Sequence, residues 1–122
     1  MAINSKGKDK VLDWKICLYK TSNDKDLAVE SLKLLLPVLE EHKKVFAEAC
    51  ATKDIMKLRF EVHKMDGGLC FYGLPCLHKA VLDFGKALRE EERIDMDLYD
   101  HMFAEIAKAK KAIEKQLKKI DN

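Results

Sequence analysis

The chain has 122 residues, which is enough for one domain and too few for two. Its 23 lysines and arginines nearly balance its 21 aspartates and glutamates, and the two signs are interspersed along the chain. A nucleic-acid-binding domain needs a clustered basic surface, so this balance argues against that class. Alanine, leucine, lysine and glutamate are abundant and β-branched residues are scarce, which favours helices over strands.

No apolar stretch is long enough to cross a membrane, and the polar segment from Met1 to Lys10 lacks the apolar run of a signal peptide. We therefore expect a cytoplasmic domain that makes no membrane contact. Residues 1–10 are predicted to be a flexible tail and residues 11–121 to form the folded domain. Four cysteines occur, namely Cys17, Cys50, Cys70 and Cys76. They form no CxxC pair and are expected to be reduced, buried small hydrophobic residues.

The first part of the chain predicts a short helix followed by a long one. The short helix covers Val11 to Lys20, and the polar run after it offers several N-caps. The long helix runs from Asp24 to Ala51, with apolar residues at helical spacing. Pro37 lies inside it and should kink it, because proline lacks a backbone donor and clashes with the preceding turn.

The third predicted helix starts at Thr52 or Lys53 and runs to Tyr72. The sequence Gly73-Leu74-Pro75 then ends it, since glycine and proline both disfavour continuation of a helix. Apolar residues of this segment fall in one arc of a helical wheel: Ile55, Leu58, Val62, Met65 and Leu69. That arc should face the core of the domain.

A fourth helix is predicted from Pro75 to Glu91 or Glu92, with the proline in its first turn. Asp95 or Asp97 opens a last helix, whose apolar residues recur at steps of three and four. Short connections force consecutive helices to be antiparallel. The fold class is therefore all-α: an antiparallel up-down-up-down four-helix bundle with a short leading N-terminal helix.

His63 is the candidate functional residue of the third predicted helix. It lies roughly 130° from the centre of the apolar arc and should point to solvent. Gly67 and Gly68 follow, although a glycine inside a helix costs about 1 kcal/mol relative to alanine. Two explanations stand: close packing of the backbone on a neighbouring helix, or open space left around the imidazole by Gly67.

The chemistry available at His63 is nucleophilic. Neutral imidazole is a good nucleophile near pH 7, with a reference pKa of about 6.5. Phosphoryl transfer needs mainly positioning and charge neutralisation. Lys64 is adjacent and Arg59 is one turn back, so both can soften the charge of a phosphoryl group. Phe60 lies near the same face, where an exposed apolar group would help a partner to dock.

The segment His63-Lys64-Met65-Asp66-Gly67, with Gly73-Leu74-Pro75 and Leu77 after it, resembles the phosphoacceptor motif of histidine-containing phosphotransfer (HPt) domains. Upstream, Leu12-Asp13-Trp14, Asp26-Leu27-Ala28 and the run from Leu32 to Leu36 are similar to the C-terminal HPt domain of BarA-type hybrid sensor kinases. The resemblance covers about residues 11 to 92. The last helix matches in pattern only.

The resemblance implies a four-helix bundle that accepts a phosphoryl group from a receiver-domain aspartate and passes it to another receiver. His63 would be the phosphoacceptor, with Lys64 and Gly67 as supporting residues. Phe60, Asp66 and Cys70 are assigned to partner docking. The implied partners are response-regulator receiver domains and a sensor histidine kinase, and the domain is expected to be monomeric. It would have no nucleotide site, cofactor or metal of its own, because the receiver supplies the magnesium, and would not be an enzyme.

Two positions depart from the family pattern. Many members carry a basic residue where this chain has Asp66, and a polar residue, often glutamine, where it has Gly85. Asp83 and Lys86 are the candidates to replace that polar side chain. These departures support an alternative function, in which a non-phosphorylated HPt-like module sequesters or scaffolds a receiver domain.

Other candidate sites in the sequence have weaker patterns. The spacing of Cys70, Cys76 and His78 matches no standard zinc motif, so no metal site is expected. Cys70 and His63 are too far apart along the helix to act as a thiol–imidazole pair. No cluster of polar residues surrounds the other histidines, which are expected to be solvated: His42, His78 and His101. The basic stretch from Lys108 to Lys119 is interpreted as the solvated face of a bundle helix.

Overall fold

The computed structural model describes residues 10–121, which contain five α-helices and no strand. The helices are α1 (Trp14–Lys20), α2 (Lys25–Ala51), α3 (Ile55–Leu69), α4 (Pro75–Glu91) and α5 (Met96–Asp121). The predicted all-α class is confirmed. None of these five helices combines the length and the hydropathy that crossing a membrane requires. Apart from Lys10, the tail predicted for residues 1–10 lies outside the described residues.

Aspartate side chains cap four of the five helices. Each accepts a hydrogen bond of 3.0 to 3.3 Å from the backbone N–H three residues later, and they are Asp13, Asp24, Asp54 and Asp95. Two helices begin later than their sequence predicted. α1 starts at Trp14 rather than Val11, and α3 starts at Ile55 rather than Thr52 or Lys53. In both, the aspartate before the first helical residue makes the better cap.

α3 also ends earlier than predicted, at Leu69 rather than Tyr72. The backbone N–H groups of Phe71 and Tyr72 bond the carbonyls three residues back, at 3.2 and 3.1 Å, as in a tightened last turn. The α3–α4 connection is therefore longer than the sequence indicated, and Cys70 stands at its start.

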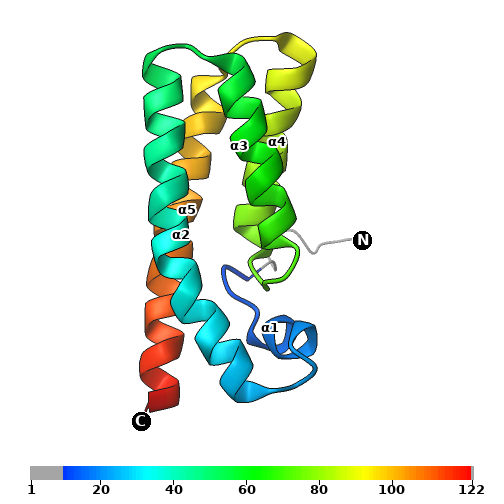
Figure 1. The fold of residues 1–122 in the computed structure, drawn as a ribbon, viewed down its shortest axis with the longest axis vertical. Helices are drawn as coiled ribbons and strands as arrows, with labels where there is room; N and C mark the ends of the chain where they lie inside the picture. The colour runs from blue at the N-terminus through cyan, green and yellow to red at the C-terminus, as the bar shows by residue number, and fades with distance from the viewer. Residues whose placement is uncertain (1–9, 122) are drawn as a thin grey trace.

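The four long helices form a closed bundle in which each packs on its neighbours in chain order, and α5 returns to α2. Consecutive helices run in opposite directions (Figure 1). The predicted up-down-up-down topology is confirmed. α2 changes direction in the middle of its length, where Pro37 lies inside it, as the sequence predicted (Figure 1).

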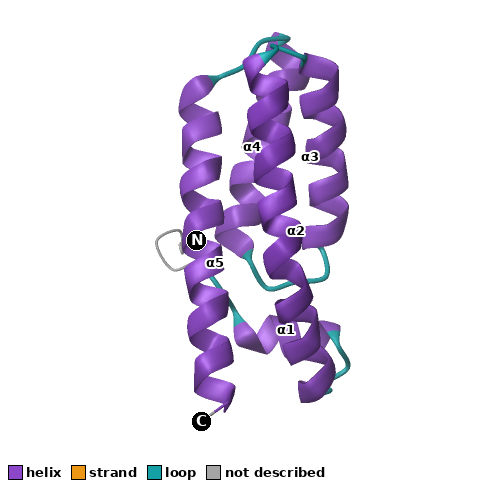
Figure 2. Ribbon diagram, turned by 60° about the vertical axis from the view of Figure 1, so that its left-hand side comes forward, coloured by secondary structure: helices purple, strands orange, loops and turns teal. Residues whose placement is uncertain are grey.

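The leading helix α1 lies beneath the shorter pair α3 and α4, beside the ends of α2 and α5 that extend beyond them (Figures 1 and 2). It is joined to the α3–α4 connection by the backbone N–H of Asp13, which donates to the carbonyl of Gly73 at 2.7 Å. A side chain at position 73 would collide with the carbonyl of Asp13, so this close contact requires glycine.

The core is a continuous apolar cluster with contributions from all five helices. At its centre Phe84 makes edge-to-face contacts with Phe46 and Tyr99, with ring centroids 6.1 and 5.8 Å apart. Cys17 belongs to this cluster, and burial raises the pKa of its thiol. All four cysteines are free, as predicted, but only Cys17 is fully buried, and Cys70 is exposed because α3 ends before it.

Candidate functional site

His63 lies in the middle of α3 with its side chain exposed. The helix turns Leu58, Val62, Met65 and Leu69 into the core, and Ile55 is half-buried at its start. The predicted core face is therefore confirmed, and so is the outward direction of the imidazole. Within the described part of the chain no side chain hydrogen-bonds this ring.

A groove of about 320 Å³ lies beside His63 on the surface where α3 meets α4. Its lining comes from α3 (Met56, Arg59, Phe60, Val62, His63 and Asp66) and from α4 (Leu82, Gly85 and Arg89). The structure thus brings four of the seven predicted site residues to one surface: Arg59, Phe60, His63 and Asp66. Lys64, Gly67 and Cys70 do not line the groove.

The positive charge of the groove comes from two arginines. Arg59 enters from α3, where its Nη1 lies 3.8 Å from the Met56 sulfur. Arg89 enters from α4, and its Nη1 lies 3.7 Å from the point where a Cβ on Gly85 would stand. Lys64 instead directs its Nζ toward Oε1 of Glu61, 3.7 Å away. Guanidinium groups are suited to binding an anion such as a phosphoryl group, since they match phosphate oxygens in a bidentate geometry.

Arg89 was not predicted from the sequence. The sequence suggested Asp83 or Lys86 as the polar partner from α4, and both suggestions are wrong in this structure. Asp83 accepts a hydrogen bond of 2.9 Å from Lys79 on its own helix, and Lys86 is exposed outside the groove. Arg89 follows Gly85 by four residues, so it lies on the same face of α4 one turn on. That spacing was the available signal.

The glycines of the site have different structural reasons. A Cβ added to Gly67 or Gly68 would meet nothing within 4 Å, which excludes close helix packing as their explanation and favours open space. Gly85 is the reverse case, because a Cβ there would stand 2.6 Å from Cγ1 of Val62. The missing side chain at Gly85 therefore permits the close approach of α4 to α3.

The side chain of Asp66 is hydrogen-bonded to a residue of α4 that the sequence did not indicate. Nε2 of His78, in the first turn of α4, donates to Oδ1 of Asp66 at 2.6 Å. This bond holds the carboxyl of Asp66 on the α4 side and reduces its repulsion of an anion at His63. The expectation of a solvated His78 is wrong, since its side chain is only 27% exposed.

His42 was also expected to be solvated and is buried instead. Its Nδ1 lies 2.6 Å from Oε2 of Glu61, and both side chains are at most one-tenth exposed. The bond joins α2 to α3 two residues before His63. His101, on α5, is exposed as predicted.

Exposed apolar side chains border the groove. Met56 and Phe60 of α3 are 68% and 71% exposed, and Leu82 of α4 is 44% exposed. Apolar groups of this size on a surface are typical of a protein-docking site when they are contiguous. These side chains lie in the same groove lining as His63, and the docking role of Phe60 stays a prediction.

Two solved structures are similar to this fold. One is the HPt domain of a sensor hybrid histidine kinase from Shewanella, with a TM-score of 0.77 and 26% identity, covering 89% of this chain and 95% of that one. The other is histidine-containing phosphotransfer protein B (HptB) from Pseudomonas aeruginosa PAO1, with a TM-score of 0.79, 19% identity, and coverage of 89% and 96%. No protein-family model and no curated protein sequence matches the chain.

The fold is a helical bundle similar to those of the two HPt proteins. The resemblance to HPt domains noted in the sequence is confirmed by both neighbours, which superpose over nearly their whole length. The chain has the fold of an HPt domain. One of the two similar structures is the HPt domain of a hybrid histidine kinase.

Proposed function

We propose that this protein is a phosphohistidine carrier of a multistep phosphorelay, with His63 as the phosphoacceptor. The observation that carries the proposal is the exposed His63 imidazole beside a groove that holds two arginines and an apolar border. The HPt folds of the two structural neighbours support the same class of function.

The reaction needs little from the carrier itself. An imidazole nitrogen of His63 attacks the phosphorus of an aspartyl phosphate on a receiver domain. The new N–P bond forms as the P–O bond breaks, and the receiver's carboxylate leaves. Arg59 and Arg89 face the charge that gathers on the phosphoryl oxygens, which is the main catalytic demand of such a transfer. The reverse sequence returns the group to a second receiver, whose own magnesium assists.

The remaining expectations belong to this proposal. Receiver domains and a sensor histidine kinase are the expected partners, with Phe60 and Met56 contacting the receiver. The domain would act as a cytoplasmic monomer, would not be an enzyme, and would need no cofactor. Gly67 would keep the approach to the imidazole open.

A second candidate is an HPt-like module that binds a receiver without being phosphorylated. It is favoured by the absence of a polar side chain at Gly85 and by the lack, among residues 10–121, of any hydrogen bond that steadies His63. This candidate requires docking but no reaction at the imidazole.

The test follows labelled phosphate from phosphorylated receiver domains to the purified protein. Wild type is compared with His63→Gln and with His101→Gln, which removes an exposed histidine on another helix. The carrier function predicts an acid-labile, alkali-stable label on wild type and His101→Gln only. Receiver binding without label on any of the three proteins would contradict it and establish the binding module.

A further inference from the structure

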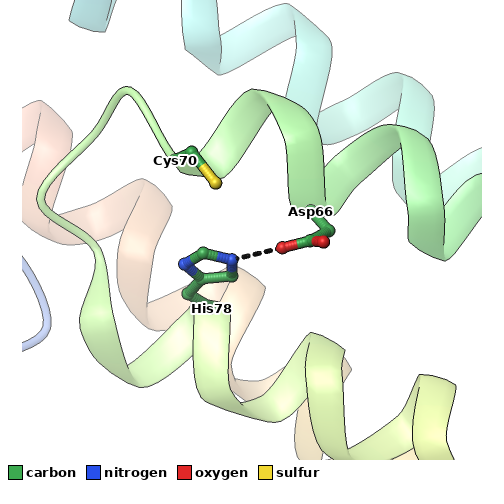
Figure 3. A group of neighbouring side chains, drawn as sticks. All are labelled: Asp66, Cys70 and His78. Atoms are coloured by element: carbon green, nitrogen blue, oxygen red, sulfur yellow. Dashed lines mark hydrogen bonds and ion pairs between the residues drawn. The ribbon is translucent and has the colours of Figure 1, made fainter.

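Three side chains that are apart in the sequence meet at the α3–α4 connection. Asp66 and Cys70 stand one turn apart at the end of α3, and His78 comes from the first turn of α4 (Figure 3). One ligand atom from each residue lies within 4.8 Å of the other two. Figure 3 shows the Cys70 sulfur pointing toward the space in front of the hydrogen-bonded Asp66 and His78.

We propose that Asp66, Cys70 and His78 form a binding site for a divalent transition-metal ion, with zinc as the best match. Thiolate, imidazole and carboxylate are the three donors that zinc takes in proteins, and three protein ligands leave the fourth position for solvent. The hard cations magnesium and calcium take oxygen donors instead and are not expected here. A thiolate and a carboxylate together supply two negative charges to offset the ion.

The distances fit such an ion after a small adjustment. Zinc bonds of about 2.0 to 2.3 Å place two tetrahedral ligands roughly 3.3 to 3.8 Å apart. The Asp66–His78 pair, now at 2.6 Å, must open by about 1 Å, and the wider separations, at most 4.8 Å, must close by about the same amount. The change requires rotation of the exposed Cys70 side chain and small shifts of the partly exposed Asp66 and His78 side chains.

The site is accessible from solvent. Cys70 is exposed, and Asp66 and His78 are partly exposed. A hollow of about 340 Å³ bounded by Cys70 and His78 lies next to the cluster, with space for a metal-bound water. Lys20 of α1 also lines this hollow and adds a positive charge to it. An entering ion therefore has a path from solvent, with the positive charge of Lys20 in the lining of that path.

Binding has a defined proton balance. The thiol of Cys70 must lose its proton, and the proton on Nε2 of His78 must leave or move to Nδ1 to free a lone pair. The hydrogen bond to Asp66 is then replaced by two metal bonds. Metal affinity should consequently fall as pH falls, because protons compete for the same atoms.

The sequence did not predict this set. From the sequence, Cys70 and His78 were considered together with Cys76 as a possible ligand set. The sulfur of Cys76 instead donates to the backbone carbonyl of Lys10 at 3.4 Å. The third member is Asp66, which the α3–α4 packing brings across to His78. The proposal concerns metal binding at Asp66, Cys70 and His78 and requires no reaction at His63, although Asp66 also lines the groove beside His63.

The experiment titrates the 122-residue chain with Co²⁺ and then with Zn²⁺. The reductant is a phosphine, because dithiols bind zinc themselves. Cobalt bound by a thiolate shows a charge-transfer absorption that reports the sulfur directly. The variants are Cys70→Ser, Asp66→Asn and His78→Gln. The matched control is Cys76→Ser, which removes a nearby thiol outside the cluster, and circular dichroism checks that each variant is folded.

Wild type and Cys76→Ser are expected to bind one Co²⁺ per chain and to show the charge-transfer band. Added Zn²⁺ should displace the cobalt and abolish the band. The band should be lost in Cys70→Ser, and the affinity should fall on the order of tenfold or more in Asp66→Asn and His78→Gln. Absence of one-to-one binding in wild type, or a band that persists in folded Cys70→Ser, would overturn the proposal.

Discussion

Gly85 of α4 packs directly against Val62 of α3, so that a Cβ at Gly85 would stand only 2.6 Å from Cγ1 of Val62. Val62 precedes His63, and the contact therefore sets how close α4 comes to the helix that carries His63. A position where many HPt domains have a polar side chain is used here for packing. The polar group that α4 contributes to the groove is instead the guanidinium of Arg89, one helical turn after Gly85.

Gly85→Ala should destabilise the fold. The added methyl group forces either Val62 or the whole of α4 to move, and overpacking of this kind costs typically about 1 to 3 kcal/mol. That loss outweighs the gain in helix propensity, which is about 1 kcal/mol. Urea denaturation followed by circular dichroism measures the change. Unchanged or increased stability would show that the two helices separate without cost.

Gly67→Ala should have the opposite effect. Nothing lies within 4 Å of a Cβ at this position, so alanine adds helix propensity without a clash. The expected gain is about 0.5 to 1 kcal/mol in the free energy of unfolding. The same denaturation experiment applies, with Gly68→Ala as a second open position. A loss of stability in both variants would mean that the space is not open in solution.

The features predictable from the sequence were those fixed by local periodicity. The core face of α3, the outward direction of His63 and the antiparallel order of the helices all follow from spacing and loop length. Helix starts were less predictable, because Asp54 competed with Thr52 and Lys53 as a cap. Sequence could place residues on a face of a helix, but not align the faces of two helices.

The unpredicted contacts are accordingly those between helices. Arg89 lines the same groove as His63, His78 bonds Asp66, and His42 bonds Glu61 only because of the register at which α2, α3 and α4 pack. No periodicity within one helix encodes that register. The glycines illustrate the same limit, since Gly67 and Gly85 look alike in the sequence and have opposite surroundings in the fold.

His42→Leu should destabilise the protein because it leaves the buried carboxyl of Glu61 without its hydrogen bond to α2. The expected loss is about 2 to 4 kcal/mol, with Lys64 retaining a weak contact to the other oxygen. The control is the double variant His42→Leu/Glu61→Leu, which removes both polar groups. It should lose less than the sum of the single variants in urea denaturation. Additive losses would show that the two residues do not interact.

Arg89→Met should slow phosphoryl transfer from a receiver to His63 by roughly tenfold or more, since it removes one positive charge from the groove but keeps an apolar stem. Lys86→Met removes the same charge from an exposed position of α4 outside the groove. Its transfer rate should stay near that of wild type. Rapid-quench measurement of the labelled protein compares the three. Equal slowing in both variants would assign the effect to net charge instead of to the groove.

Phe60→Ala should weaken receiver binding without weakening the fold. The side chain is 71% exposed beside the groove, so its removal should change the unfolding free energy by less than about 0.5 kcal/mol. A docking role predicts a rise in the dissociation constant of about tenfold or more, as for an aromatic anchor at an interface. Calorimetric titration with an unphosphorylated receiver measures it.

The matched control for that titration is Leu34→Ala, which removes a side chain of similar exposure, 67%, from α2 outside the groove. Leu34→Ala should bind the receiver like wild type, and so should His63→Gln, because the imidazole is needed for reaction more than for docking. If Leu34→Ala weakened binding as much as Phe60→Ala, the receiver would not be reading the α3–α4 groove, and the apolar border beside His63 would have no part in docking.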